Sequence, residues 1–304
     1  MNNYRPVSNL NFLSKVLERL VSSRLKAYLT REGLASNFQS AYRECHSTET
    51  ALLRVHNDII RWADQKHCTA LVLLDLSAAF DTIDQDLLLH RLRTYFGIKG
   101  KALEWIASYL TERSQSVQIF SSASCSSSST GAVTSTAVPL CYGVPQGSVL
   151  GPVLFTLYTT PLSDIIEKHE LHHHLYADDT QVYIPISEGN EDQQAVKIKN
   201  CLNEIKDWML VNKLKLNDNK TEIMLLGTNQ QRANIAFDCL EIGNATISIE
   251  STKAIRNLGF YFDPDLSMKT QGTMSSSMKI CLDLLVKTSR SFAAVIQALD
   301  EELR

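Results

Sequence analysis

The sequence has no long apolar run, no apolar leader and no paired cysteine motif. No hydrophobic stretch approaches the roughly 20 residues that a membrane-spanning helix needs, so we expect no membrane association. The first residues, Met1 to Arg5, lack the apolar core of a secretion signal. The 7 cysteines are scattered without a Cys-x-x-Cys pair, which predicts reduced thiols and no zinc site. We therefore expect a protein that is not secreted and acts inside the cell, in the nucleus, the cytoplasm or both.

Net charge is also small. The formal charge of −3 over 304 residues argues against a protein that coats nucleic acid through charge alone. The charges are unevenly distributed, because residues 1–70 hold 10 Lys or Arg and 6 Asp or Glu, whereas residues 71–187 hold 6 and 11. An acidic centre suits bound cations and a basic flank suits phosphates, although a difference of this size also arises by chance.

Apolar spacing predicts helices and strands in mixed order, without internal repeats. Helical spacing covers residues 13–21, after a cap at Ser8-Asn9, and residues 49–62, 84–97, 103–110, 153–158 and 198–209. Strands are predicted at residues 69–75, 174–176, 180–186, 214–216, 222–227 and 255–262. The Ser-rich residues 121–136 predict a mobile surface loop. This order indicates an α+β sheet packed by helices.

Two of these strands differ in their expected burial. The continuous apolar run from Thr69 to Asp75 predicts a strand that is buried on both faces. Val182, Ile184 and Ile186 instead alternate with more polar positions, which predicts a half-buried strand.

Asp178 and Asp179 form the most informative pair in the chain. They lie between two β-like runs, so we expect them at a tight hairpin turn. Asp is common in turns, and plain turn chemistry is one explanation of the pair. Two adjacent carboxylates also repel each other, and a bound cation relieves that repulsion. On these residues alone, a turn and a metal site are about equally supported.

Asp75 ends the predicted buried strand about a hundred residues earlier. If that strand neighbours the hairpin strands in one sheet, three carboxylates converge at one edge. Oxygen ligands suit Mg²⁺ or Mn²⁺, and two such ions assist phosphoryl transfer. Taken alone, Asp75 is equally well explained as a helix-capping or strand-end acid. His172-His173-His174 has no matched partners, which favours a partly exposed strand entry over a metal site.

Several stretches, in order and at sensible spacing, resemble the motifs of reverse transcriptases. The catalytic and primer-grip motifs are resembled by Asp75–Asp81, Gly143–Phe155, Tyr176–Asp179, Leu216–Glu222 and Ile255–Phe260. Upstream, Tyr4–Ser8 and Phe38–Arg43 resemble the fingers of enzymes from non-long-terminal-repeat (LINE-type) retrotransposons. The resemblance covers about residues 4–268, and the joint order of the motifs makes it specific.

This resemblance implies a right-hand polymerase architecture. Fingers and palm are expected, with an antiparallel palm sheet packed by helices and a thumb that is truncated or absent. The implied boundaries are fingers at 1–70, palm with interleaved fingers segments at 71–228, a primer-grip region at 229–268 and a divergent tail at 269–304. The endonuclease domain usual upstream in such elements is also expected to be absent.

The implied activity is RNA-directed DNA synthesis. A primer 3′-OH would attack a deoxynucleoside triphosphate on an RNA template, with Mg²⁺ or Mn²⁺ as cofactor. The implied partners are therefore an RNA template, a DNA primer and a dNTP. One alternative is a catalytically inactive, nucleic-acid-binding relic of a truncated retrotransposon, and a weaker one is an RNA-templated RNA polymerase.

The resemblance also implies a role for each motif residue. Asp75 and Asp178 match the principal metal ligands, Asp179 the third acid, and Lys220 a proton donor to the leaving pyrophosphate. Substrate-binding and primer-grip roles fall on the triphosphate-binding Arg43, the 2′-OH-excluding Phe80, the nucleotide loop Gln146-Gly147 and the primer-contacting Leu258-Gly259. Taken singly, Arg43 and Lys220 also fit exposed surface residues, and Phe80 fits a core side chain. Gln146-Gly147 also fits a plain turn, and Leu258-Gly259 fits strand core.

Overall fold

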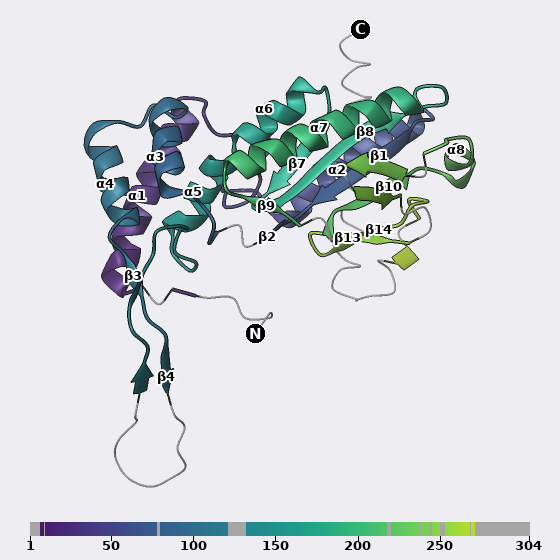
Figure 1. Cartoon of the computed structure of the whole chain (residues 1–304). Helices are drawn as coiled ribbons and strands as arrows, with labels where there is room; N and C mark the ends of the chain where they lie inside the picture. Colours follow the sequence, from purple (N-terminus) through teal and green to yellow (C-terminus); the bar gives the residue numbers. More distant parts are fainter. Residues whose placement is uncertain are drawn as a thin grey trace. The chain divides into compact units, whose positions relative to one another are not determined.

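The computed structural model describes residues 7–8, 10–77, 80–120, 132–217, 220–237, 239–242, 245–249, 253–267 and 269–270. The chain divides into two compact units (Figure 1). The helical unit comprises Met1–Ala35, Ala78–Tyr158 and Asn212–Leu214, and the sheet unit comprises Ser36–Ser77, Thr159–Val211 and Lys215–Arg304. Residues 121–131 of the predicted Ser-rich loop and 271–304 of the predicted tail lie outside the described residues. The domain boundaries implied above stay predictions.

A four-stranded sheet in the order β10-β1-β8-β7 forms the centre of the sheet unit. Its strands are β10 (Glu222–Leu226), β1 (Cys68–Leu74), β8 (Asp179–Ile186) and β7 (His172–Tyr176). All three neighbouring pairs are antiparallel. The predicted α+β class with an antiparallel sheet is confirmed.

Strand β1 lies between β10 and β8, and almost all of its side chains are buried. Leu71 belongs to a hydrophobic cluster that it forms with Leu52, Val55 and Ile59 of helix α2 (Thr48–Asp64). Its neighbours Ala70 and Val72 are also fully buried. Side chains alternate between the faces of a sheet, so these three residues bury both faces. The prediction of a strand buried on both faces is confirmed.

Strand β8 is also buried on both faces, and the prediction of a half-buried strand was wrong. Val182, Ile184 and Ile186 form one buried face, but Gln181 and Tyr183 on the other face are buried as well. The reason is packing: Tyr183 belongs to the cluster under α2, and its hydroxyl donates to Asp58 Oδ2 at 2.8 Å.

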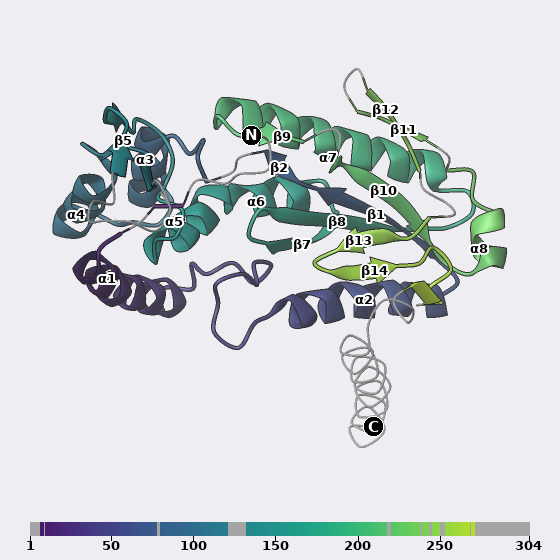
Figure 2. The same ribbon diagram turned by 90° about the horizontal axis from the view of Figure 1, so that it is seen from below.

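Helices cover the two faces of this sheet (Figures 1 and 2). Helix α2 packs on one face with the hairpin β13 (Ile255–Asn257) and β14 (Phe260–Phe262). Helix α7 (Glu191–Val211) lies on the other face, beside α6 (Pro161–Lys168). The shared cluster under α2 contains buried side chains of the helix, the sheet and the hairpin: Leu52, Val55, Ile59, Leu71, Tyr183, Met224, Leu226, Ile255, Phe260 and Phe262.

The β13–β14 hairpin corrects a second prediction, because residues 255–262 were expected to form one strand. Asn257 pairs with Phe260, so Leu258-Gly259 is a two-residue turn. Both turn residues have positive φ, +49° and +83°, the pattern of a type I′ turn. The remaining elements of the sheet unit are β2 (Leu76–Ser77), β9 (Lys215–Leu216), α8 (Asn229–Ala233), β11 (Cys239–Ile242) and β12 (Ala245–Ser248).

The helical unit contains α1 (Phe12–Arg31), α3 (Gln85–Thr94), α4 (Gly100–Leu110) and most of α5 (Leu150–Thr159). Its small strands are β3 (Ser114–Gln115), β4 (Gln118–Phe120), β5 (Ala132–Thr134) and β6 (Val138–Pro139), which pair as β3–β6 and β4–β5. Residues 132–134 are therefore strand, although the sequence predicted loop. Asp84 caps α3 as predicted, by accepting from the Leu87 N–H.

Helix α1 departs from its prediction in two ways. Its cap is Asn11, whose side chain accepts from the Ser14 N–H, and not the predicted Ser8-Asn9. Its buried side chains are Glu18, Ser22, Leu25 and Leu29. The apolar residues that predicted the helix face outward instead, among them Leu13, Leu17 and Leu20 at 72%, 55% and 54% exposure. Within the described part of the chain, no helix combines the length and hydropathy that crossing a membrane requires.

Candidate functional site

The register between β1 and β8 brings Asp75 and Asp179 to the same end of the sheet. Leu74, the last residue of β1, pairs with Thr180. Because the strands are antiparallel, Asp75 follows Leu74 at the end where Asp179 begins β8. The condition stated for the carboxylates, that their two strands are neighbours in one sheet, is therefore met.

Asp178 lies in the turn that joins β7 to β8. Tyr176 pairs with Asp179, which leaves Ala177-Asp178 as a two-residue hairpin turn, as predicted. Ala177 has a φ of +56°, and Asp178 is not among the residues with positive φ. Positive φ at the first turn residue alone is the pattern of a type II′ turn, where Gly is the usual residue.

Like charge and burial act together on Asp179. Its pKa is raised to about 6, first by burial and then by the Asp178 and Asp75 carboxylates, while Lys220 lowers it. The Asp178 and Asp75 carboxylates are therefore close enough to destabilise the charged form of Asp179. A cation beside them would reverse this effect.

Asp75 is bonded to the loop between β9 and β10. Lys220 Nζ lies 2.8 Å from Asp75 Oδ2, and Asn217 donates its backbone N–H to the Asp75 carbonyl at 2.9 Å. These contacts place the predicted proton donor beside a predicted metal ligand. Asp218 and Asn219 of the same predicted motif lie outside the described residues.

A cavity of about 530 Å³ opens beside these groups, entirely within the sheet unit. Asp75, Asp179 and Lys220 line it together with the predicted primer-contacting turn, Leu258-Gly259. Arg256 of β13 is exposed and also lines it, a residue to which sequence reasoning assigned no role. Two of the predicted metal ligands and the predicted primer-contacting turn therefore line the same cavity.

Across the described residues, no group of three or more His, Cys, Asp or Glu side chains is arranged to hold a metal ion. The metal-ligand roles of Asp75, Asp178 and Asp179 therefore stay predictions. Their chemistry nevertheless fits a hard divalent cation, because the donors are carboxylate oxygens, and burial and then the neighbouring carboxylates raise the pKa of Asp179.

The segment Phe38–Ala41, which we call the edge segment, lies against β7. Leu175 donates its N–H to the Phe38 carbonyl at 2.7 Å, and Ser40 donates its N–H to the Leu175 carbonyl at 3.1 Å. The Gln39 amide is buried and bonds to Ala177 in the turn. No residue spacing revealed this contact.

Two residues after the edge segment have different surroundings. The pKa of Tyr42 is raised, first by partial burial and then by the nearby Asp178 carboxylate. Arg43 Nη1 donates to the Ser36 carbonyl at 2.8 Å. Its triphosphate-binding role stays a prediction.

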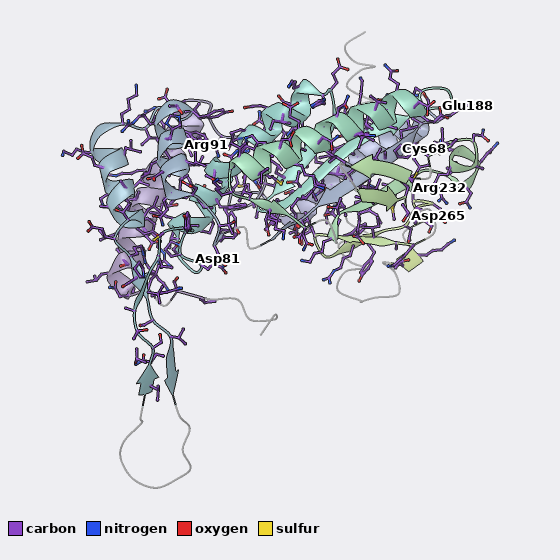
Figure 3. All side chains as sticks on the ribbon, in the orientation of Figure 1. Cys68, Asp81, Arg91, Glu188, Arg232 and Asp265 are labelled. Carbon is purple, nitrogen blue, oxygen red and sulfur yellow. The ribbon has the colours of Figure 1, made fainter. Side chains whose placement is uncertain are left out.

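Phe80, Gln146 and Gly147 belong to the helical unit, and their predicted approach to the carboxylates stays a prediction. The Phe80 ring stacks on Phe155 with 4.7 Å between ring centroids. Gln146 Nε2 donates to Asp81 Oδ2 at 2.8 Å, and Figure 3 labels this aspartate in the helical unit. Asp81 thereby orients the Gln146 amide, a role that sequence reasoning missed.

The loop around Gln146 depends on glycine and on a buried acid. Gly143 has a φ of +82°, and a Cβ there would lie 2.9 Å from the Asp81 carbonyl oxygen and 3.0 Å from that of Phe80. Glu18 of α1 is buried and accepts the N–H groups of Val149 and Leu150 at 2.6 and 3.1 Å. A carboxylate at this helix start stabilises α5 and the loop before it.

Residues 1–262 match the family described as reverse transcriptase (RNA-dependent DNA polymerase). Among curated relatives, a probable RNA-directed DNA polymerase from transposon BS of Drosophila melanogaster is 32% identical over 52% of this chain and 16% of the relative. The RNA-directed DNA polymerase from mobile element jockey of the same organism is 31% identical over 60% of this chain and 19% of the relative. The chain thus spans less than a fifth of either protein in these matches.

Solved structures of similar fold include two structures of telomerase from Candida tropicalis. The apo form truncated from the C-terminal domain has a TM-score of 0.52 and 15% identity, over 87% of this chain and 48% of that one. The complex with a fragment of telomeric RNA has a TM-score of 0.53 and 14% identity, over 87% of this chain and 38% of that one. At this identity the likeness concerns the fold, and it supports the right-hand polymerase architecture.

Proposed function

The chain belongs to the reverse transcriptase (RNA-dependent DNA polymerase) family, and from this premise we propose that it is the polymerase domain of a LINE-type retrotransposon. It would extend a DNA primer on an RNA template, with a dNTP as the nucleotide donor. The observation that carries the proposal is the β1–β8 register, which sets Asp75 beside Asp179 at a cavity shared with Lys220 and Leu258-Gly259.

Family membership implies a divalent metal ion, and we propose Mg²⁺, with Mn²⁺ as the alternative. Asp75, Asp178 and Asp179 would hold it. When bound, the ion supplies Lewis-acid stabilisation of the attacking and leaving oxygens of phosphoryl transfer. The protein then contributes positioning and fixed charge, which dominate catalysis of this class of reaction.

The remaining residues have proposed roles around the substrate. Lys220, held 2.8 Å from Asp75, would donate a proton to the leaving pyrophosphate. Arg43 would bind the triphosphate through its planar donor fork, and Phe80 would exclude a 2′-OH. Gln146-Gly147 would contact the nucleotide and template, and Leu258-Gly259 the primer end.

Primer extension on an RNA template with dNTPs and Mg²⁺ tests this function. We expect the wild-type chain to extend the primer and Asp178→Asn to lose at least about a thousandfold in rate, because one acidic ligand is gone. Asp207→Asn, a substitution of an exposed Asp on α7, is the matched control and should leave the rate unchanged.

Equal rates for wild type and Asp178→Asn would contradict the proposal. Salt-dependent binding of nucleic acid without nucleotide incorporation would instead support the inactive relic. In the same assay, Phe80→Ala should increase incorporation of ribonucleotides relative to deoxynucleotides. No such increase would remove Phe80 from the site.

A further inference from the structure

We propose that Gln39 is a positioning residue for Asp178, acting through the backbone of Ala177. Nothing in the sequence pattern or the family resemblance used above gave Gln39 a role. The inference rests on the proposed function only where it concerns nucleotide transfer. The contact itself is a property of the fold.

The bonds of the Gln39 amide converge on the turn. Gln39 Oε1 accepts the Ala177 N–H at 3.0 Å and the Ala41 N–H at 2.9 Å, and Gln39 Nε2 lies 3.5 Å from the Ala177 carbonyl oxygen. Both short bonds need an acceptor, so the orientation of the amide is fixed by its neighbours. One side chain therefore contacts the turn backbone on both sides of the Ala177 Cα.

The turn needs such support because of its residue type. Ala177 has a φ of +56°, a positive value that a residue with a Cβ adopts at a cost. Glycine would adopt it freely, but this chain has alanine. A buried amide bonded to the Ala177 N–H stabilises this conformation in place of glycine's freedom.

The support is rigid because the edge segment is itself anchored. Its backbone bonds to Leu175 on β7 from both sides of Gln39, through the Phe38 carbonyl and the Ser40 N–H. Gln39 is only 8% exposed, so water competes little for its bonds. A direct path thus runs from the β7 edge through Gln39 to the residue that precedes Asp178.

Hydrogen exchange on the full chain tests the contact independently of catalysis. We expect the turn amides, Ala177 above all, to exchange at least about tenfold faster in Gln39→Met, which keeps the length of the side chain and removes its bonds. Exchange in α7 should not change. Ser40→Ala is the matched control, because it removes a bond from the edge segment without touching the turn.

Primer extension tests whether the Gln39 contact affects nucleotide transfer. Gln39→Met and Gln39→Ala should lower kcat about 100-fold, with less than about a threefold change in the dNTP KM, because Asp178 is misplaced while the triphosphate contacts remain. Ser40→Ala should stay within about threefold of wild type. Adding Ala177→Gly to Gln39→Ala should restore at least about tenfold, because glycine no longer needs the support.

Unchanged exchange at the turn would overturn the contact. Faster exchange with an unchanged kcat, or no rescue by Ala177→Gly, would overturn the positioning role. If the wild-type chain does not extend a primer, the proposed function fails, whereas the exchange experiment still decides whether Gln39 holds the turn.

Discussion

The turn at Ala177-Asp178 and the loop at Pro145–Gly147 present polar groups from two different units, and different features stabilise them. A side chain from the edge segment, Gln39, bonds to the turn. The loop follows Gly143, where the absence of a side chain lets the backbone lie against Asp81. Truncating the Gln39 side chain should therefore loosen the turn, and adding a Cβ at Gly143 should disrupt the loop.

Gly143→Ala should have the largest effect on stability. The added Cβ meets backbone oxygens at 2.9 and 3.0 Å, and the φ of +82° disfavours alanine. We expect a loss of about 2–5 kcal/mol in the free energy of unfolding, measured by urea denaturation. Gly189→Ala is the control, since its φ is +88° and nothing lies within 4 Å of the new Cβ. It should cost only about 1–2 kcal/mol, and equal losses for the two variants would contradict the steric argument.

Glu18→Ala should have the second-largest effect on stability. It leaves one buried and one partly buried N–H group at the start of α5 without their carboxylate acceptor. We expect a loss of about 2–4 kcal/mol in the free energy of unfolding. Glu18→Gln keeps one acceptor oxygen and should lose about half as much. If both variants unfold at the same urea concentration as wild type, Glu18 does not stabilise this loop.

Acid should destabilise strand β7, which leads into the Ala177-Asp178 turn. Burial, and then nearby positive groups, lower the pKa of His173 and His174 to about 4 from the ordinary 6.5. The unfolded chain therefore binds these protons first, so stability is complete above about pH 6.5 and is lost as the pH falls towards 4. We expect a loss on the order of 2 kcal/mol for each imidazole.

Unfolding measured between pH 7 and 4 checks this dependence. His174→Asn should flatten the pH profile, because one of the two protonations no longer contributes. A profile identical to wild type would exclude His174 as its source. In native-state hydrogen exchange, residues 172–183 should lose protection in acid before residues 143–151 do, which separates the turn from the loop.

Tyr183→Phe should have the smallest effect on the free energy of unfolding. The Tyr183 hydroxyl donates to Asp58 Oδ2 at 2.8 Å on the strand that follows the turn. Losing this bond should cost about 1 kcal/mol. Asp58→Asn should cost a similar amount, and the double variant should cost less than the sum because both changes affect one bond. Full additivity would show that the two side chains do not stabilise each other.

The sequence could predict the features that depend on local chemistry. A continuous apolar run ending in Asp75 leaves a buried strand as the simplest outcome, and two Asp between β-like runs indicate a turn. The family resemblance implied an antiparallel palm sheet, but the pairing of these two strands was only a condition of the metal-site argument. Its register, which sets Asp75 beside Asp179, became visible only in the sheet.

Other features depend on what packs against a segment, and the sequence does not contain that information in local form. Gln181 looked like the exposed side of a half-buried strand, yet it is fully buried on the α2 face. Leu258 has a left-handed φ of +49°, which leucine rarely adopts, so a hairpin turn was mistaken for a strand. Gln39 acts through a contact 138 residues away along the chain.

Helix α1 has a consequence for how the purified chain behaves in solution. Its outward apolar side chains include Phe12, Leu13 and Leu17, at 76%, 72% and 55% exposure. Association through such a surface strengthens in sulfate or phosphate salts, whereas binding to nucleic acid weakens as salt rises. A salt titration followed by light scattering therefore distinguishes the two kinds of complex by the opposite signs of their salt dependence.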